Sequence, residues 1–120
     1  MSRAATSVFA FGCYLAVNGL LLIAKPGLLL NPLGIATPTE PWIHVLGVVV
    51  LVLSAYYIGA SRTEQVGFFR MTTWVRPGAL AGFVVLALLG DAPWAIVGFG
   101  VVDLLGALWT SAALKADAKG

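Results

Sequence analysis

Four apolar runs, each long enough to cross a lipid bilayer, take up most of this 120-residue chain. A helix needs about 20 mostly apolar residues to cross a hydrocarbon core about 30 Å thick. The chain is 60% hydrophobic and only 10% charged, which is the composition of a membrane protein. We therefore expect an all-α fold, an integral membrane four-helix bundle that forms one transmembrane domain over residues 1–120. The expected spans are about 6–24, 42–60, 72–90 and 93–114.

The joints between the runs carry signals for helix ends. The first run is expected to be an uncleaved helix, because leucines continue where a signal peptide would have its small-residue cleavage site. The proline-rich stretch "GLLLNPLGIATPTEP" is too short to span and is expected at the membrane interface. Thr37 and Glu40 have capping-box spacing, which places the start of the second helix near Thr39. Pro77 should kink or restart the third helix, and Asp91 is the expected N-cap of the fourth.

The distribution of basic residues predicts the orientation. With four spans, only Lys25 falls on one side of the membrane, and the other basic residues fall on the opposite side. Those residues are Arg3, Arg62, Arg70, Arg76, Lys115 and Lys119. Because cytoplasmic loops carry an excess of Lys and Arg, we expect both termini in the cytoplasm. The basic balance is thus a topology signal, and we expect no nucleic-acid partner.

Asp103 lies in the middle of the apolar stretch "AIVGFGVVDLLGALWT". An ionised carboxylate in hydrocarbon costs several kcal/mol or more unless it is paired. Gly100, Gly106 and Thr110 share its helix face, so this face should point at other helices. Asn18 of the first helix lies at about the same depth. Two interpretations stay open: a structural hydrogen-bonded pair, or a ligand or proton site that lines a cavity.

His44 and Glu40 are spaced i, i+4 at the outer end of the second helix. We include both in the candidate ligand or proton site, because they could pass protons toward Asp103. One histidine and one carboxylate are too few for a good metal site, so no metal is expected.

Three arginines gather near the expected cytoplasmic edge. Arg62, Arg70 and Arg76 are candidates for contact with lipid phosphates or with an anionic ligand. The alternative is that they only snorkel to the interface and set the orientation.

Four glycines are expected to permit close helix packing. Gly78 and Gly82 form a G-x-x-x-G pattern, which allows close approach within the bundle or between protomers. Gly100 and Gly106 belong to the small-residue face around Asp103.

The sequence has no Cys/His metal array, Gly-rich phosphate loop or serine-nucleophile elbow. A single cysteine, Cys13, excludes a self-contained dithiol redox site. These observations favour a role that is not enzymatic for the chain on its own.

A first helix ending in "AKPGLLLNPLGI", an interfacial joint, a Gly-containing second helix and a tight final hairpin resemble the DoxX-like four-helix membrane proteins. The resemblance implies a multi-pass protein of the bacterial inner membrane that acts as a ligand-binding or quinone-associated module or as an accessory subunit. The residues identify no cofactor, and quinone is suggested by this resemblance alone. The expected partners are membrane lipid and either a membrane protein or further copies of the chain in a homo-oligomer. The alternatives are a proton-coupled small-solute transporter and a structural subunit of a membrane complex.

Overall fold

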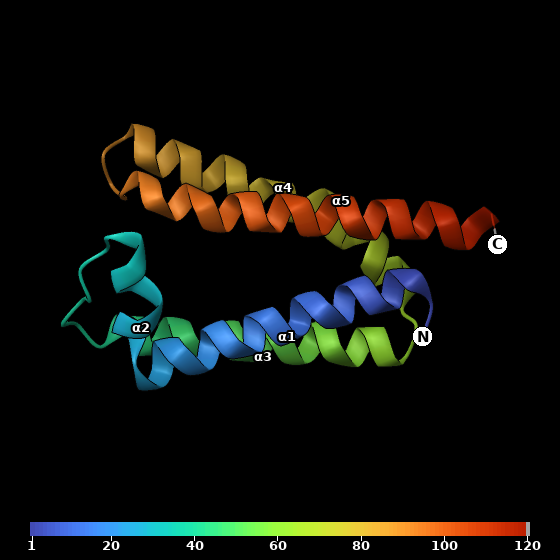
Figure 1. The fold of residues 1–120 in the computed structure, drawn as a ribbon, viewed down its shortest axis with the longest axis horizontal. Helices are drawn as coiled ribbons and strands as arrows, with labels where there is room; N and C mark the ends of the chain where they lie inside the picture. Colours follow the sequence, from blue (N-terminus) through green and yellow to red (C-terminus); the bar gives the residue numbers. More distant parts are fainter. Residues whose placement is uncertain (120) are drawn as a thin grey trace.

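The structure is a computed structural model that describes residues 1–119. The regular secondary structure of these residues is entirely helical. The four long helices are α1 (Arg3–Ala24), α3 (Trp42–Arg62), α4 (Val66–Leu88) and α5 (Val97–Lys119), as Figure 1 shows. Three short elements join them, namely α2 (Pro26–Leu30), η1 (Asn31–Leu33) and η2 (Trp94–Ile96). All four long segments are long and apolar enough to cross a membrane. The prediction of an all-α bundle with four such helices is confirmed.

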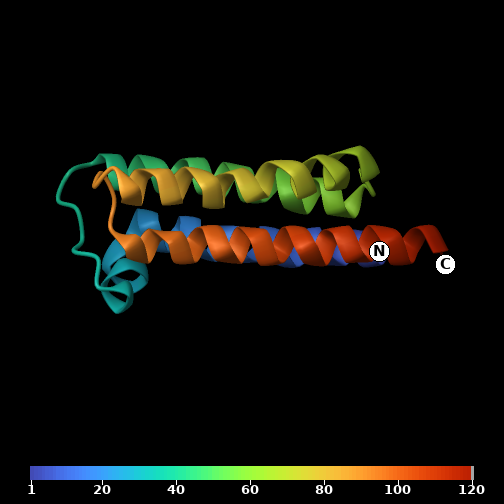
Figure 2. The same ribbon diagram turned by 90° about the horizontal axis from the view of Figure 1, so that it is seen from above.

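The helices form two pairs. α1 packs mainly against α3 and α4 mainly against α5, whereas the two pairs meet chiefly through α1 and α5. In Figure 1 the pairs come together at the end that holds the two termini and diverge toward the end that holds α2, and in Figure 2 α5 overlies α1 while α4 overlies α3. We call these two ends the closed end and the open end. Along the side where α3 faces α4, which we call the seam, the two backbones make little contact.

Glycines permit the close contact within each pair. A Cβ added to Gly19 would lie 2.8 Å from the backbone nitrogen of Leu51, and one on Gly47 would lie 2.9 Å from the carbonyl oxygen of Gly19. In the second pair, a Cβ on Gly100 would lie 2.6 Å from the Cα of Leu80. Any larger residue would force the backbones of the paired helices apart.

The closed end is held by a clasp of carboxylates around the start of α1. The Ser2 hydroxyl accepts a hydrogen bond from the Ala5 amide (3.0 Å) and donates to Glu64 (2.6 Å), which also accepts from the Ser2 amide (2.9 Å). The Asp117 carboxylate of α5 accepts from the amides of Arg3 (3.2 Å) and Ala4 (3.0 Å). The first amides of a helix lack partners and carry partial positive charge. Ser2, Glu64 and Asp117, which we call the clasp, supply acceptor oxygens and negative charge to these amides.

Two expected caps do not form. α3 begins at Trp42, directly after Pro41, and has no side-chain cap. Since proline favours the first positions of a helix, the start moves beyond the reach of Thr37, whose hydroxyl bonds the Asn31 amide oxygen instead (3.2 Å). Asp91 does not cap the last helix either, because its amide donates to the Leu86 carbonyl (2.9 Å) and so closes the end of α4.

α4 begins at Val66, before the expected start at residue 72, and continues through Pro77 as one helix. The expected restart at Pro77 is therefore wrong. Arg76 consequently lies about 15 Å along the helix from its first residue, at a rise of 1.5 Å per residue. This length moves Arg76 from the expected edge of the bundle to its interior.

Candidate functional site

The Arg76 side chain is the most unusual feature of the interior. It is only 4% exposed, on a helix that otherwise carries apolar and small residues at this depth. Its Nη2 atom donates to the Gly106 carbonyl oxygen (3.1 Å) and to the Thr110 hydroxyl (2.8 Å). Its Nε and Nη1 atoms are buried and have no hydrogen-bond partner within the described part of the chain. A buried donor without a partner costs about 1–3 kcal/mol, and more when it is charged.

Aromatic rings surround the guanidinium. The Arg76 Cζ atom lies 4.5 Å from the centroid of the Phe11 ring on α1 and 5.8 Å from that of Tyr57 on α3. A cation over an aromatic face is attracted by the negative face of the ring, and more strongly away from water. Gly106 makes room for the group, since a Cβ there would lie 2.8 Å from Arg76 Nη1. All four long helices thus contribute to the site.

A chain of hydroxyl groups leads from Arg76 toward the closed end. The Ser7 hydroxyl donates to the Ala4 carbonyl (2.7 Å) and lies 2.8 Å from the Thr110 hydroxyl, both in buried positions. Thr110 therefore donates to Ser7 and accepts from Arg76. Arginine can only donate, and Ser7 gives its single proton to the Ala4 carbonyl, so these two groups together set the direction of the bonds in this chain.

Asp103 lies partly buried on α5, on the same face as Gly106 and Thr110. Its charge interacts with that of Arg76, yet no ion pair or hydrogen bond joins the two side chains in the described part of the chain. Asn18 is also partly buried, but residues 1–119 contain no hydrogen bond between Asn18 and Asp103. The expected pair is therefore not formed directly, and the ligand or proton role of both residues stays a prediction.

His44 and Glu40 lie apart from this site. The His44 ring is exposed, and its Nδ1 atom lies 2.9 Å from the Ile23 carbonyl and 3.1 Å from the Leu22 carbonyl. It thus binds carbonyls at the end of α1, which the helix itself leaves unpaired. Glu40 is exposed in the bend before α3. This arrangement gives His44 a structural role, and a relay to Asp103 has no connecting contacts among the described residues.

The three arginines separate into two environments. Arg62 and Arg70 are exposed, as expected for residues near a membrane surface, whereas Arg76 is enclosed by the bundle and does not snorkel. Sequence reasoning missed Phe11 and Tyr57 as its neighbours. The sequence does carry one signal for the burial of Arg76. Phe69, Thr72 and Arg76 recur at helical spacing on one face of α4, and all three are buried.

The predicted packing glycines also separate. Gly100 and Gly106 are in close contact with α4 and with Arg76, respectively, whereas a Cβ on Gly78 or Gly82 would meet nothing within 4 Å. The G-x-x-x-G pattern therefore lies on the surface, and its use between protomers stays a prediction. In the described residues, no group of three or more His, Cys, Asp or Glu is placed to hold a metal ion.

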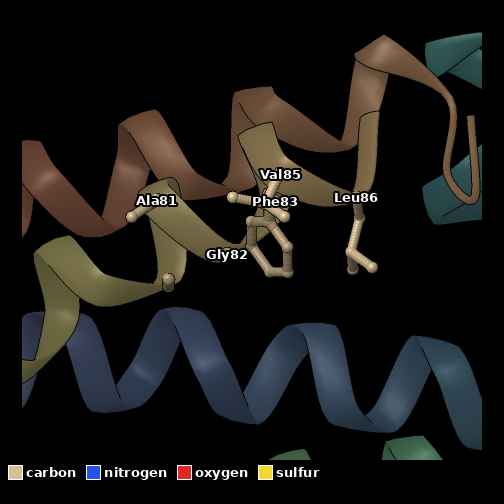
Figure 3. Close-up of a pocket in the computed structure, with 6 residues that line it drawn as sticks. Ala81, Gly82, Phe83, Val85 and Leu86 are labelled. Carbon is tan, nitrogen blue, oxygen red and sulfur yellow. The ribbon is translucent and has the colours of Figure 1, made fainter. Parts of the chain in front are cut away.

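A shallow apolar hollow of about 520 Å³ lies on α4 beyond Arg76 (Figure 3). Ala79, Ala81, Gly82, Phe83, Val85 and Leu86 line it. In Figure 3 the side chains of Phe83 and Leu86 extend from α4 toward the side on which α1 lies. The volume is in the range of small-molecule sites.

Comparison of the chain with protein-family models, with curated proteins and with solved structures finds no match.

Proposed function

We propose that this chain is a multi-pass protein of the bacterial inner membrane, of DoxX-like type, with both termini in the cytoplasm. Four apolar helices and the one-sided basic residues support this placement. We further propose that it binds a small ligand inside the bundle through Arg76.

The observation that carries this function is the pair of unpartnered nitrogens on Arg76. Nε and Nη1 are buried donors, and among residues 1–119 the polar partners of the side chain, Gly106 and Thr110, both bind Nη2. A ligand that presents an acceptor oxygen would satisfy one of the free donors, and a carbonyl or a carboxylate fits this requirement. Quinones carry such carbonyl oxygens, which is consistent with the resemblance to DoxX-like proteins.

The surroundings of Arg76 favour a planar or apolar ligand over a hydrated solute. Phe11 and Tyr57 cover the guanidinium with aromatic surface, and Tyr57 is 6% exposed. Binding sites for small molecules are mostly apolar with few polar groups that fix orientation. Asp103 is an acidic candidate for a second contact, since it lies one helical turn before Gly106, whose carbonyl accepts from Arg76.

Native mass spectrometry of the protein in nanodiscs tests the binding function. We expect the wild-type protein to retain a small ligand and Arg76→Gln to lose it, whereas the exposed-arginine control Arg70→Gln should retain it. Arg76→Lys keeps the charge but presents a single nitrogen. If this variant folds like the wild type and also loses the ligand, the loss does not follow from failure to fold. Equal retention by the wild type and Arg76→Gln would refute a ligand site at Arg76.

Cysteine labelling in a Cys13→Ala background tests the orientation. Labels near Arg3, near Gln65 and in the tail should be protected from a reagent applied outside. Labels near Ala36 and Ala92 should react. Reaction at Gln65 from outside would overturn the four-span arrangement.

A further inference from the structure

The two helix pairs form a wedge whose narrow part contains Arg76. At the closed end, hydrogen bonds from Ser2 to Glu64 join the start of α1 to the segment between α3 and α4. Two residues of α5 join that helix to α1: Asp117 accepts from the amide of Ala4, and Thr110 bonds Ser7. Toward the open end, the pairs diverge (Figure 1), and along the seam the backbones of α3 and α4 make little contact. The two pairs are thus tied together on the closed side of Arg76, and few contacts join α3 to α4 along the seam.

The hollow on α4 lies on the open side of Arg76. Ala79 and Phe83 follow Arg76 by three and seven residues, which places them on the same face of the helix. Leu86, at the far edge of the hollow, is ten residues on, or about 15 Å along the axis. None of the residues that line the hollow has a polar side chain.

We infer that the ligand is a single-chain amphiphile that reaches Arg76 sideways from the bilayer through the seam. Its acceptor oxygen binds one of the two free donors of Arg76, Nε or Nη1, and its apolar chain, about 15 Å long, lies in the hollow and points toward the open end. This inference rests on the proposed function and adds the class of ligand and its route.

The difference in polarity between Arg76 and the hollow decides the orientation of the ligand. Arg76 is buried with two free donors, so the polar head belongs at the narrow part of the wedge. The hollow offers no hydrogen-bond partner, so a peptide or a polar solute would leave its own polar groups unpaired there. An alkyl chain has no such groups and leaves the lipid phase without losing an apolar environment.

Photo-crosslinking in nanodiscs tests where the chain lies. Two probes are used, a long-chain carboxylic acid and a long-chain methyl ketone, each with a diazirine at the end of the chain. We expect adducts of one or both probes to be enriched several-fold on residues 79–86 over the lipid-exposed residues of α3, and to fall to background in Arg76→Gln. The probe with the stronger enrichment identifies the charged or the neutral head group.

Two glycines on α4 provide a matched pair of variants. Gly82 lines the hollow and Gly78 does not, and an added side chain meets nothing within 4 Å at either position. Gly82→Leu should fill the hollow and reduce labelling by the long-chain probes several-fold, whereas Gly78→Leu should label like the wild type. Competition by butyrate or 2-butanone, which have the same heads without the chain, should be unchanged in both variants.

The outcomes separate this inference from the proposed function. Labelling spread evenly over the lipid-exposed helices, with butyrate or 2-butanone binding that still depends on Arg76, would overturn the chain site and leave the ligand site standing. If labelling and short-probe binding are both independent of Arg76, the chain site and the proposed ligand site are both overturned.

Discussion

The closed and open ends of the bundle are built differently. At the closed end, a buried cluster includes residues from α1, α3, α4 and α5, with Val8 and Phe69 at 0% exposure. At the open end, the buried cluster consists of Leu22, Leu30 and Ile43, which belong to α1, α2 and α3 alone. Core packing therefore ties the two pairs together at one end and leaves them independent at the other. Arg76, which lies over Phe11 of the closed-end cluster, therefore belongs to the part of the bundle where the pairs are joined.

The largest expected effect concerns packing inside a pair. Gly100→Ala puts a Cβ 2.6 Å from the Leu80 Cα and should lower the free energy of unfolding by about 1–3 kcal/mol, the usual cost of overpacking. Gly98→Ala meets nothing within 4 Å, so it should be neutral or stabilising by up to about 1 kcal/mol. Titration with a denaturing detergent, followed by circular dichroism, measures both. Equal effects would mean that α4 and α5 are not in close contact.

The next effect concerns the link between the pairs. Thr110→Val removes the hydroxyl that accepts from Arg76 and donates to Ser7, and should cost about 0.6–1.7 kcal/mol, as other hydrogen bonds between membrane helices do. Thr73→Val is the control, because the Thr73 hydroxyl bonds only the Arg70 carbonyl of its own helix. The same unfolding titration applies. If both variants lose equal stability, the hydroxyl chain does not hold the pairs together.

A smaller effect is expected at the clasp. Asp117→Asn keeps an acceptor oxygen but removes the charge beside the start of α1, and should cost about 0.3–1 kcal/mol. Asp91→Asn, a change of the same type in an exposed residue at the open end, should have no effect. A cost at Asp91 as large as that at Asp117 would contradict the difference between the ends.

The smallest effect is a pH dependence at the same clasp. Hydrogen bonds from the Ser2 hydroxyl and amide lower the pKa of Glu64 below its ordinary value of 4.5. The contribution of these hydrogen bonds to the free energy of unfolding is therefore fully present above pH 4.5. It is lost as the pH falls through the lowered pKa of Glu64. The stability difference between the wild type and Glu64→Gln should shrink below pH 4.5. A difference that stays constant down to pH 3 would show that these bonds do not form, since about one unit below the ordinary value most unbonded carboxyls are protonated.

Long apolar runs made the four helices predictable, because length and hydropathy alone require them. The site was harder to predict, since it depends on how the helices meet. The sequence marks Asp103 as a charge in an apolar run, whereas the pattern around Pro77 predicts an edge position for Arg76. Only the start of α4 at Val66 reveals that Arg76 is internal. The fixed rings of Phe11 and Tyr57 beside it are tertiary contacts that no spacing within one helix encodes.

The burial of Arg76 has a consequence for biosynthesis. In the proposed membrane placement, a charge at mid-helix opposes insertion of α4 on its own, and its bonding partners Gly106 and Thr110 lie on α5, which follows α4 in the chain. α1 and α3 can pair as soon as they are made, because their contacts need nothing from later segments. Insertion of α4 is more favourable when α5 is present to bind Arg76, so we expect these two helices to enter the membrane together as a hairpin.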